Sequence, residues 1–144
     1  MPKYKSIGID LHGVMDAKIE VFKYVTNILM AKGTKIYVVS GPDLRSIQNE
    51  LRGYGFKQDI HYAGVYSIVD YLKGKGVNMW QSKDKTWWAS DRDWWSAKAE
   101  ICKEIPVEAM VDDNAGYAGY FRGSGIKFYL YNPGRNRLLE EIGL

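Results

Sequence analysis

Short apolar runs alternate with amphipathic helical patterns along this chain of 144 residues. Residues 4–11 and 35–39 predict strands, and helical patterns over residues 17–32 and 43–52 follow them. The second strand is a nearly continuous apolar run, as expected of a strand that is buried on both faces. A β-α-β-α order of this kind predicts an α/β fold with a parallel, doubly wound sheet.

The rest of the chain continues the pattern with one less regular stretch in the middle. Residues 65–73 read as a helix, and residues 77–80 and 86–89 read as a short hairpin around a polar loop. The later elements are expected as a helix, a strand, a short helix, a strand and a closing helix, over residues 93–104, 107–111, 114–121, 126–131 and 136–142. Nothing in this order marks a linker, so residues 1–144 are interpreted as a single domain with a small insert at about residues 57–92.

Composition restricts the class of protein. Hydrophobic residues make up 46% and charged residues 26%, which is typical of a soluble globular protein. The net charge of +3 is spread along the chain, without the basic stripe that would favour nucleic acid as a partner. The single cysteine, Cys102, excludes an internal disulfide and is expected to be buried in a helix. No apolar run is long enough for a membrane span or a signal peptide, so a cytoplasmic protein is expected.

Polar side chains follow several of the predicted strands. Asp10 and Ser40 come at the ends of the first two strands, and Asp112 and Asp113 come at the end of a later one. Ligands of open parallel sheets bind outside these carboxyl ends. Three carboxylates gathered there would repel one another unless a hard cation such as Mg²⁺ held them. The alternative is that Asp10 is a turn residue and that the acid pair caps the following helix.

Other residues near the predicted edge suit phosphoryl chemistry. The Ser40 hydroxyl and the Gly41 backbone N–H are candidate donors to phosphoryl oxygens, and Lys98 is a candidate to neutralise their charge. His12 is either a proton shuttle or a structural histidine. A plain turn serine and a solvated helix lysine are the simpler alternatives for Ser40 and Lys98.

All five tryptophans lie between Trp80 and Trp95. They form either a lid that stacks on a base or sugar ring, the core of a small insert, or a surface for self-association. The sequence leaves these three roles open.

Four fragments in order resemble the motifs of the haloacid dehalogenase (HAD) superfamily of phosphohydrolases. The first is Asp10-Leu-His12-Gly-Val14, and the second is the apolar run that ends in Ser40-Gly41. The third is a helix lysine, for which Lys98 is the first candidate and Lys75 the second, and the fourth is Val111-Asp112-Asp113.

The resemblance implies a Rossmann-like three-layer sandwich with a mainly parallel central sheet. It implies Mg²⁺ held by Asp10, the His12 backbone carbonyl, Asp112 and Asp113, and an attack by Asp10 on the phosphoryl group of a small phosphorylated substrate. Ser40, Gly41 and Lys98 would then hold the transferring oxygens. The region of residues 57–92 corresponds to the position of a cap and is short for one.

His12 departs from the family pattern, which has a second aspartate there as the general acid. Two functions follow from this difference. The first is a Mg²⁺-dependent phosphohydrolase that acts on a small phosphorylated metabolite, with a nucleotide suggested by the tryptophans, through an aspartyl-phosphate. The second is a catalytically reduced binding or regulatory protein that keeps the metal site.

Overall fold

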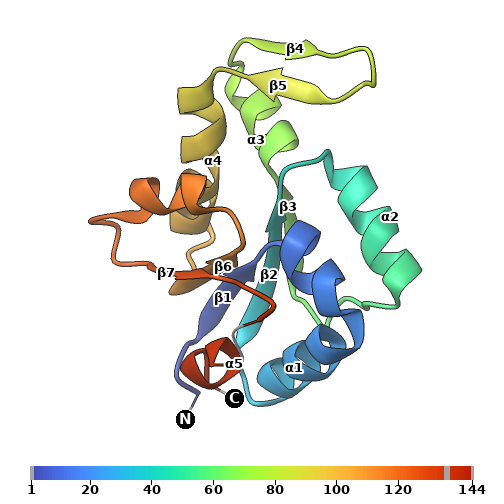
Figure 1. Cartoon of the computed structure of the whole chain (residues 1–144), viewed down its shortest axis with the longest axis vertical. Coiled ribbons are helices and arrows are strands. Elements are labelled where there is room, and N and C mark those ends of the chain that lie inside the picture. Colours follow the sequence, from blue (N-terminus) through green and yellow to red (C-terminus); the bar gives the residue numbers. More distant parts are fainter. Residues whose placement is uncertain (1, 135–136, 144) are drawn as a thin grey trace.

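The computed structural model describes residues 2–134 and 137–143, and it has an α/β fold built on a five-stranded parallel sheet. The strand order is β3-β2-β1-β6-β7. The strands are β1 (Ser6–Ile9), β2 (Lys35–Ser40), β3 (Gly64–Ser67), β6 (Ala109–Asp112) and β7 (Lys127–Leu130). The α/β prediction is therefore confirmed, and the order reverses direction at β1, between β2 and β6 (Figure 1).

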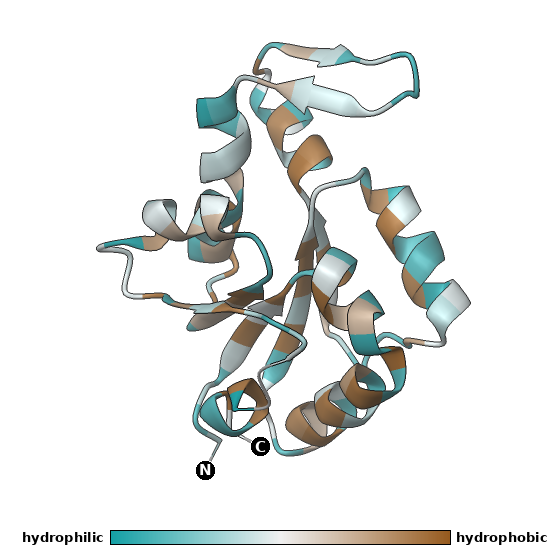
Figure 2. Cartoon of the chain, viewed as in Figure 1, coloured by the Kyte–Doolittle hydropathy of each residue, from teal (hydrophilic) through white to brown (hydrophobic). Residues whose placement is uncertain are grey.

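Helices cover both faces of the sheet and complete a three-layer sandwich (Figure 1). One face packs against α1 (Ile19–Ala31), α2 (Leu44–Tyr54) and α5 (Leu138–Glu141). The other face packs against α3 (Ile68–Lys75), α4 (Asp91–Glu104) and the 3-10 helix η3 (Ala115–Phe121). Each layer has its own buried apolar cluster, so the sheet lies between two cores, and Figure 2 shows hydrophobic colour along the central strands.

Polar caps determine where several helices begin. The side chains of Asp43, Ser67 and Ser90 accept hydrogen bonds from backbone N–H groups in the first turns of α2, α3 and α4. Such caps satisfy donors that a helix start leaves without a partner. The cap of α2 directly follows Gly41 and Pro42, so this helix starts at the edge where β2 ends.

Two local predictions are wrong. Residues 64–67 form β3 and pair with β2, and the helix expected from residue 65 begins only at Ile68. The long helix expected over residues 17–32 begins only at Ile19, and the Asp16 carboxylate accepts from the Gly13 N–H at 2.7 Å in the turn before it. Two short helical segments, Leu11–Met15 and Asp16–Lys18, precede α1. Of the expected closing helix, residue 136 lies outside the described residues.

The region expected as an insert is smaller than residues 57–92. Strand β3 and helix α3 belong to the central sheet and to the layer that covers it. What remains is a two-stranded antiparallel hairpin, β4 (Met79–Gln81) and β5 (Trp87–Ala89). The hairpin projects beyond α3 and α4 at the end of the molecule away from both termini (Figure 1).

Two further expectations concern burial and membranes. Cys102 is buried in α4, as expected, with its Sγ 3.7 Å from the Met110 Sδ. Across residues 2–134 and 137–143, no helix combines the length and the apolar character that crossing a membrane requires.

Candidate active site

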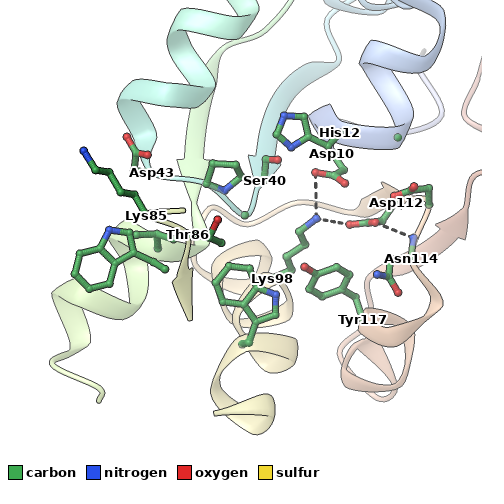
Figure 3. Close-up of a pocket in the computed structure, with 17 residues that line it drawn as sticks. Asp10, His12, Ser40, Asp43, Lys85, Thr86, Lys98, Asp112, Asn114 and Tyr117 are labelled. Carbon is green, nitrogen blue, oxygen red and sulfur yellow. Dashed lines mark hydrogen bonds and ion pairs between the residues drawn. The ribbon is translucent and has the colours of Figure 1, made fainter. Parts of the chain in front are cut away.

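The polar residues expected at the strand ends do meet at one edge of the sheet. Asp10 directly follows β1, Ser40 ends β2 and Asp112 ends β6. The Asp10 N–H donates to the Val111 carbonyl at 3.0 Å, so the chain leaves β1 while still bound to β6. A cavity of about 590 Å³ opens above these residues (Figure 3). It lies where the strand order reverses, which is the usual position of ligands in this architecture.

Lys98 lies at the floor of the cavity and reaches it from α4. Its side chain is 1% exposed, and its Nζ lies 3.2 Å from the Asp10 Oδ1 and donates a hydrogen bond to the Asp112 Oδ2 (Figure 3). The Tyr117 ring covers the ammonium group, with its centroid 4.3 Å from Nζ. Burial alone lowers the pKa of Lys98, but the Asp10 and Asp112 carboxylates outweigh it and hold this pKa above its usual value. Lys98 therefore remains a cation.

Asp112 is completely buried and is bound on both sides. One carboxylate oxygen accepts from Lys98, and the other accepts from the Asn114 N–H at 3.0 Å. Burial raises the pKa of Asp112 although Lys98 opposes the shift, and the nearby Asp10 carboxylate raises it further. The site thus concentrates negative charge that a single ammonium group compensates only in part.

The acid cluster provides ligand atoms for a metal ion. Carboxylate oxygens of Asp10, Asp112 and Asp113 lie within 4.8 Å of one another. Three hard oxygen donors at this spacing fit a hard cation of the Mg²⁺ class after a small contraction, because two oxygens on one Mg²⁺ lie at most about 4.2 Å apart. Burial and the Asp112 charge raise the pKa of Asp113, which a bound cation would reverse.

Gly13 makes room for the third carboxylate. Its φ of +83° lies in the left-handed region, and a Cβ built there would overlap the Asp113 carboxylate. Any larger residue at this position would displace the Asp113 carboxylate from its place in the acid cluster. The glycine of the first sequence fragment therefore has a steric role in the acid cluster.

His12 faces the cavity and is paired with a residue that the sequence did not single out. Its Nε2 lies 2.7 Å from the Oε2 of Glu50, which α2 contributes. The side chains are 43% and 35% exposed, so the pair lies at the rim (Figure 3 labels His12). The Glu50 carboxylate accepts from the His12 Nε2–H and so favours the tautomer or charge state that has a proton on Nε2.

Ser40 and Gly41 lie on the opposite side of the floor from Asp112. Ser40 is 1% exposed and lines the cavity together with Gly41. Figure 3 shows Ser40, Asp10 and Lys98 directed toward the same space. Lys75, the second candidate for the motif lysine, lies elsewhere and pairs with Glu100 at 2.6 Å. The structure thus brings together the candidates Asp10, His12, Ser40, Gly41, Lys98, Asp112 and Asp113.

The tryptophans divide between different environments. Trp87 and Trp94 line the cavity, whereas Trp80 and Trp88 are 51% and 46% exposed. Trp95 packs on Tyr117 with ring centroids 4.7 Å apart. The tryptophan segment therefore does not act as one unit, and the three roles that the sequence left open remain predictions.

Some site residues carried no sequence signal. Glu50 and Tyr117 lie on helices far along the chain from their partners His12 and Lys98, and nothing in their local sequence marks those pairs. Thr86 and Lys85 of the hairpin loop also line the cavity. The sequence identifies this loop only as the turn of a hairpin and indicates no role for it in the site.

Comparisons with known proteins support the fold and give no family. No protein-family model matches the chain, and no curated protein matches it. A chain in a structure of the Pnkp1/Rnl/Hen1 RNA repair complex aligns over 90% of this chain, with 15% identity and a TM-score of 0.57. A chain in another structure of the Pnkp1/Rnl/Hen1 complex aligns over 92%, with 13% identity and a TM-score of 0.54.

The present chain spans less than half of each of those proteins, 42% of the first and 48% of the second. At this level of identity the similarity concerns the fold. It agrees with the Rossmann-like three-layer arrangement found here.

Proposed function

We propose that this protein is a Mg²⁺-dependent phosphohydrolase of the HAD type that acts on a small phosphorylated molecule. The observation that carries the proposal is the buried Lys98 ammonium, held between Asp10 and Asp112 at the floor of an open cavity. A structural ion pair alone would not require a hydroxyl, a further carboxylate and a histidine around the same space. Phosphoryl transfer uses all of them, for positioning and for charge stabilisation.

The reaction would proceed in two displacements. The Asp10 carboxylate attacks phosphorus, the bond from phosphorus to the leaving oxygen breaks, and an aspartyl-phosphate forms. The leaving oxygen takes a proton from His12 or from water. A water molecule then attacks the aspartyl-phosphate and gives a proton to His12 or to solvent, the bond from phosphorus to the Asp10 oxygen breaks, and inorganic phosphate leaves. The sum is hydrolysis of one phosphate ester by one water molecule.

Lys98 and the residues at the end of β2 would stabilise the charge that develops on the transferring oxygens. The Lys98 ammonium is fixed before substrate arrives, so little reorganisation accompanies the reaction. The Ser40 hydroxyl and the Gly41 N–H would donate from the other side. Asp10, Asp112, Asp113 and the His12 carbonyl would hold Mg²⁺, which supplies further positive charge beside the phosphoryl group.

Phosphate release from a panel of phosphorylated metabolites tests the proposal. We expect release by the wild type that requires Mg²⁺ and is abolished in Asp10→Asn. Glu50→Gln serves as a comparison, because it alters the partner of His12 and leaves the acid cluster intact. Release that persists in Asp10→Asn would contradict the mechanism.

The alternative function is a binding or regulatory protein that keeps the metal site. It is favoured by His12, which stands where the HAD pattern has an acid. Under this alternative the wild type binds Mg²⁺ but releases no phosphate, whereas His12→Asp gains turnover. The multi-protein complex that contains the structural neighbours is a reason to include a search for partner proteins, for which the exposed Trp80 and Trp88 are the first residues to change.

A further inference from the structure

The cavity is larger than a phosphoryl group needs. Its volume of about 590 Å³ is within the range of about 300–1,000 Å³ of pockets that enclose whole ligands. The acid cluster, Ser40 and Lys98 occupy the floor. The upper part is lined by residues of the hairpin and of α4, and it is here that the organic part of a substrate would lie.

Trp94 connects the floor with this upper part. A Cβ added to Gly41 would lie 3.1 Å from the Trp94 Cζ2, so the indole packs directly against the backbone of Gly41. Its other neighbour is Trp88 of β5, at a ring-centroid distance of 6.4 Å. A substrate whose phosphoryl group lies between Asp10 and Ser40 would therefore meet an aromatic surface just beyond the phosphate.

Trp87 of the hairpin lines the same cavity. The Lys73 Nζ lies 3.9 Å from the centroid of its ring, which holds the indole in place from the side of α3. The ring is only partly buried and lines the cavity. Trp87 and Trp94 together make an aromatic wall, which we define by these two residues.

Polar groups accompany the aromatic wall. Lys85 and Thr86 of the hairpin loop and Asp43 at the start of α2 line the same cavity (Figure 3). They offer an ammonium donor, a hydroxyl and a carboxylate acceptor beside the indoles. A nucleobase has both a π face that can stack on the indoles and hydrogen-bonding edges that these polar groups can meet.

We infer that the aromatic wall of Trp87 and Trp94 binds a nucleobase, so that the substrate is a nucleoside that carries a terminal phosphate. The inference rests on the proposed function for the position of the phosphate. The nucleoside phosphate is either a free nucleotide or the phosphorylated end of an oligonucleotide, since both present the same chemistry to the wall.

The test compares substrates that differ only in the base. Mg²⁺-dependent kcat/KM is measured with adenosine 5′-monophosphate and with ribose 5-phosphate, for the wild type, Trp87→Ala, Trp87→Phe and Trp80→Ala. Trp80 is the matched control, because it belongs to the same hairpin, is exposed and does not line the cavity. A short oligonucleotide with a terminal phosphate forms a further arm.

We expect Trp87→Ala to lower kcat/KM for the nucleotide about 5- to 150-fold, the effect of one lost base–aromatic stack. The value for ribose 5-phosphate should change less than about twofold, and Trp87→Phe should restore most of the loss. Trp80→Ala should behave as the wild type. A higher kcat/KM for the oligonucleotide than for the mononucleotide would identify the end of a nucleic acid as the substrate. A higher value for the mononucleotide would identify a free nucleotide.

Equal kcat/KM for the two substrates in the wild type, or an equal loss for both in Trp87→Ala, would overturn the inference. Calorimetric binding of the same two ligands to Asp10→Asn gives the comparison without turnover. If no substrate is hydrolysed, the proposed function fails. The inference then stands only if the nucleotide binds more tightly than ribose 5-phosphate and Trp87→Ala removes the difference.

Discussion

At the residue scale the site depends on the compensation of buried charge. Lys98 is the counter-ion of two carboxylates that have almost no access to solvent. A buried ion pair adds little to stability by itself, but removal of one partner leaves the other charge uncompensated. Lys98 is therefore expected to matter for folding as well as for phosphoryl transfer.

The substitution Lys98→Met tests this compensation. We expect the free energy of unfolding in urea to fall by about 3–5 kcal/mol, because Asp10 and Asp112 then remain buried without their cation. Saturating Mg²⁺ should recover part of the loss, since the metal replaces the missing positive charge. Unchanged stability in the absence of metal would show that the two carboxylates are solvated or protonated in the folded protein.

A second prediction concerns Gly13. The substitution Gly13→Ala should weaken Mg²⁺ binding in a calorimetric titration by at least tenfold, the size of effect seen when groups that orient metal ligands are changed. The physical reason is the overlap of the new methyl group with Asp113.

Gly33→Ala is the matched control for Gly13→Ala. Gly33 also has a positive φ, of 100°, but a Cβ there meets no atom within 4 Å. Both variants carry similar backbone strain, and only Gly13→Ala displaces a carboxylate. Equal effects on Mg²⁺ affinity would mean that backbone strain, rather than the position of Asp113, is responsible.

At the element scale the parallel strands were predicted best where they are most buried. The apolar runs of β1, β2 and β6 can be recognised in the sequence, and so can the polar residues at their ends. The sequence therefore predicted that Asp10, Ser40 and Asp112 lie at the same edge of the sheet. Strand β3 was missed because Gly64–Ser67 is short and runs directly into α3, so its apolar residues fit a helical period equally well.

The contacts made between elements were the part that the sequence could not supply. The pairing of His12 with Glu50 and the cover of Lys98 by Tyr117 depend on how α2 and η3 pack on the sheet. The distinction between Lys98 and Lys75 has the same origin. Both are helix lysines in sequence, and only the packing of α4 against β6 turns Lys98 toward the floor.

The layer formed by α4 also shields the one cysteine. Burial raises the pKa of Cys102 to about 12, so the thiol remains protonated and unreactive at pH 8. We expect no reaction with a disulfide reagent in the native protein and one reactive thiol per chain in denaturant, measured by absorbance. Rapid reaction under native conditions would show that α4 separates from the sheet far more easily than its packing indicates.

At the scale of the whole molecule, function and stability compete at the acid cluster. The pKa values of Asp112 and Asp113 are raised in the folded protein, chiefly by burial. An acid with a raised folded pKa binds its proton more tightly in the folded than in the unfolded state. These two groups therefore lower the stability of the metal-free protein as the pH rises from the range of unfolded carboxyls through their folded pKa values.

Magnesium at the proposed site should reverse this loss, because it would bind the deprotonated carboxylates in the folded chain. We expect a concentration of Mg²⁺ about 100-fold above its dissociation constant to raise Tm by on the order of 5–10 °C at pH 7.5. The increase should be smaller at pH 4.5, because protons compete with the metal for the two carboxylates more strongly there. Differential scanning calorimetry at both pH values, with and without Mg²⁺, measures the effect.

The substitution Asp113→Asn distinguishes the effect of the acid cluster on stability from its effect on metal binding. Asp113 is the more exposed acid of the cluster and does not contact Lys98, so its replacement leaves the central ion pairs in place. The metal-free variant should have a higher Tm than the wild type at pH 7.5 and should gain little from Mg²⁺. A Mg²⁺-induced increase in Tm that is equal at both pH values, or undiminished in Asp113→Asn, would mean that the ion binds elsewhere. A binding site for a cation is expected to destabilise the protein when it is empty and to stabilise it when the cation is bound. Carboxylates that served only the stability of the fold would instead have lowered pKa values.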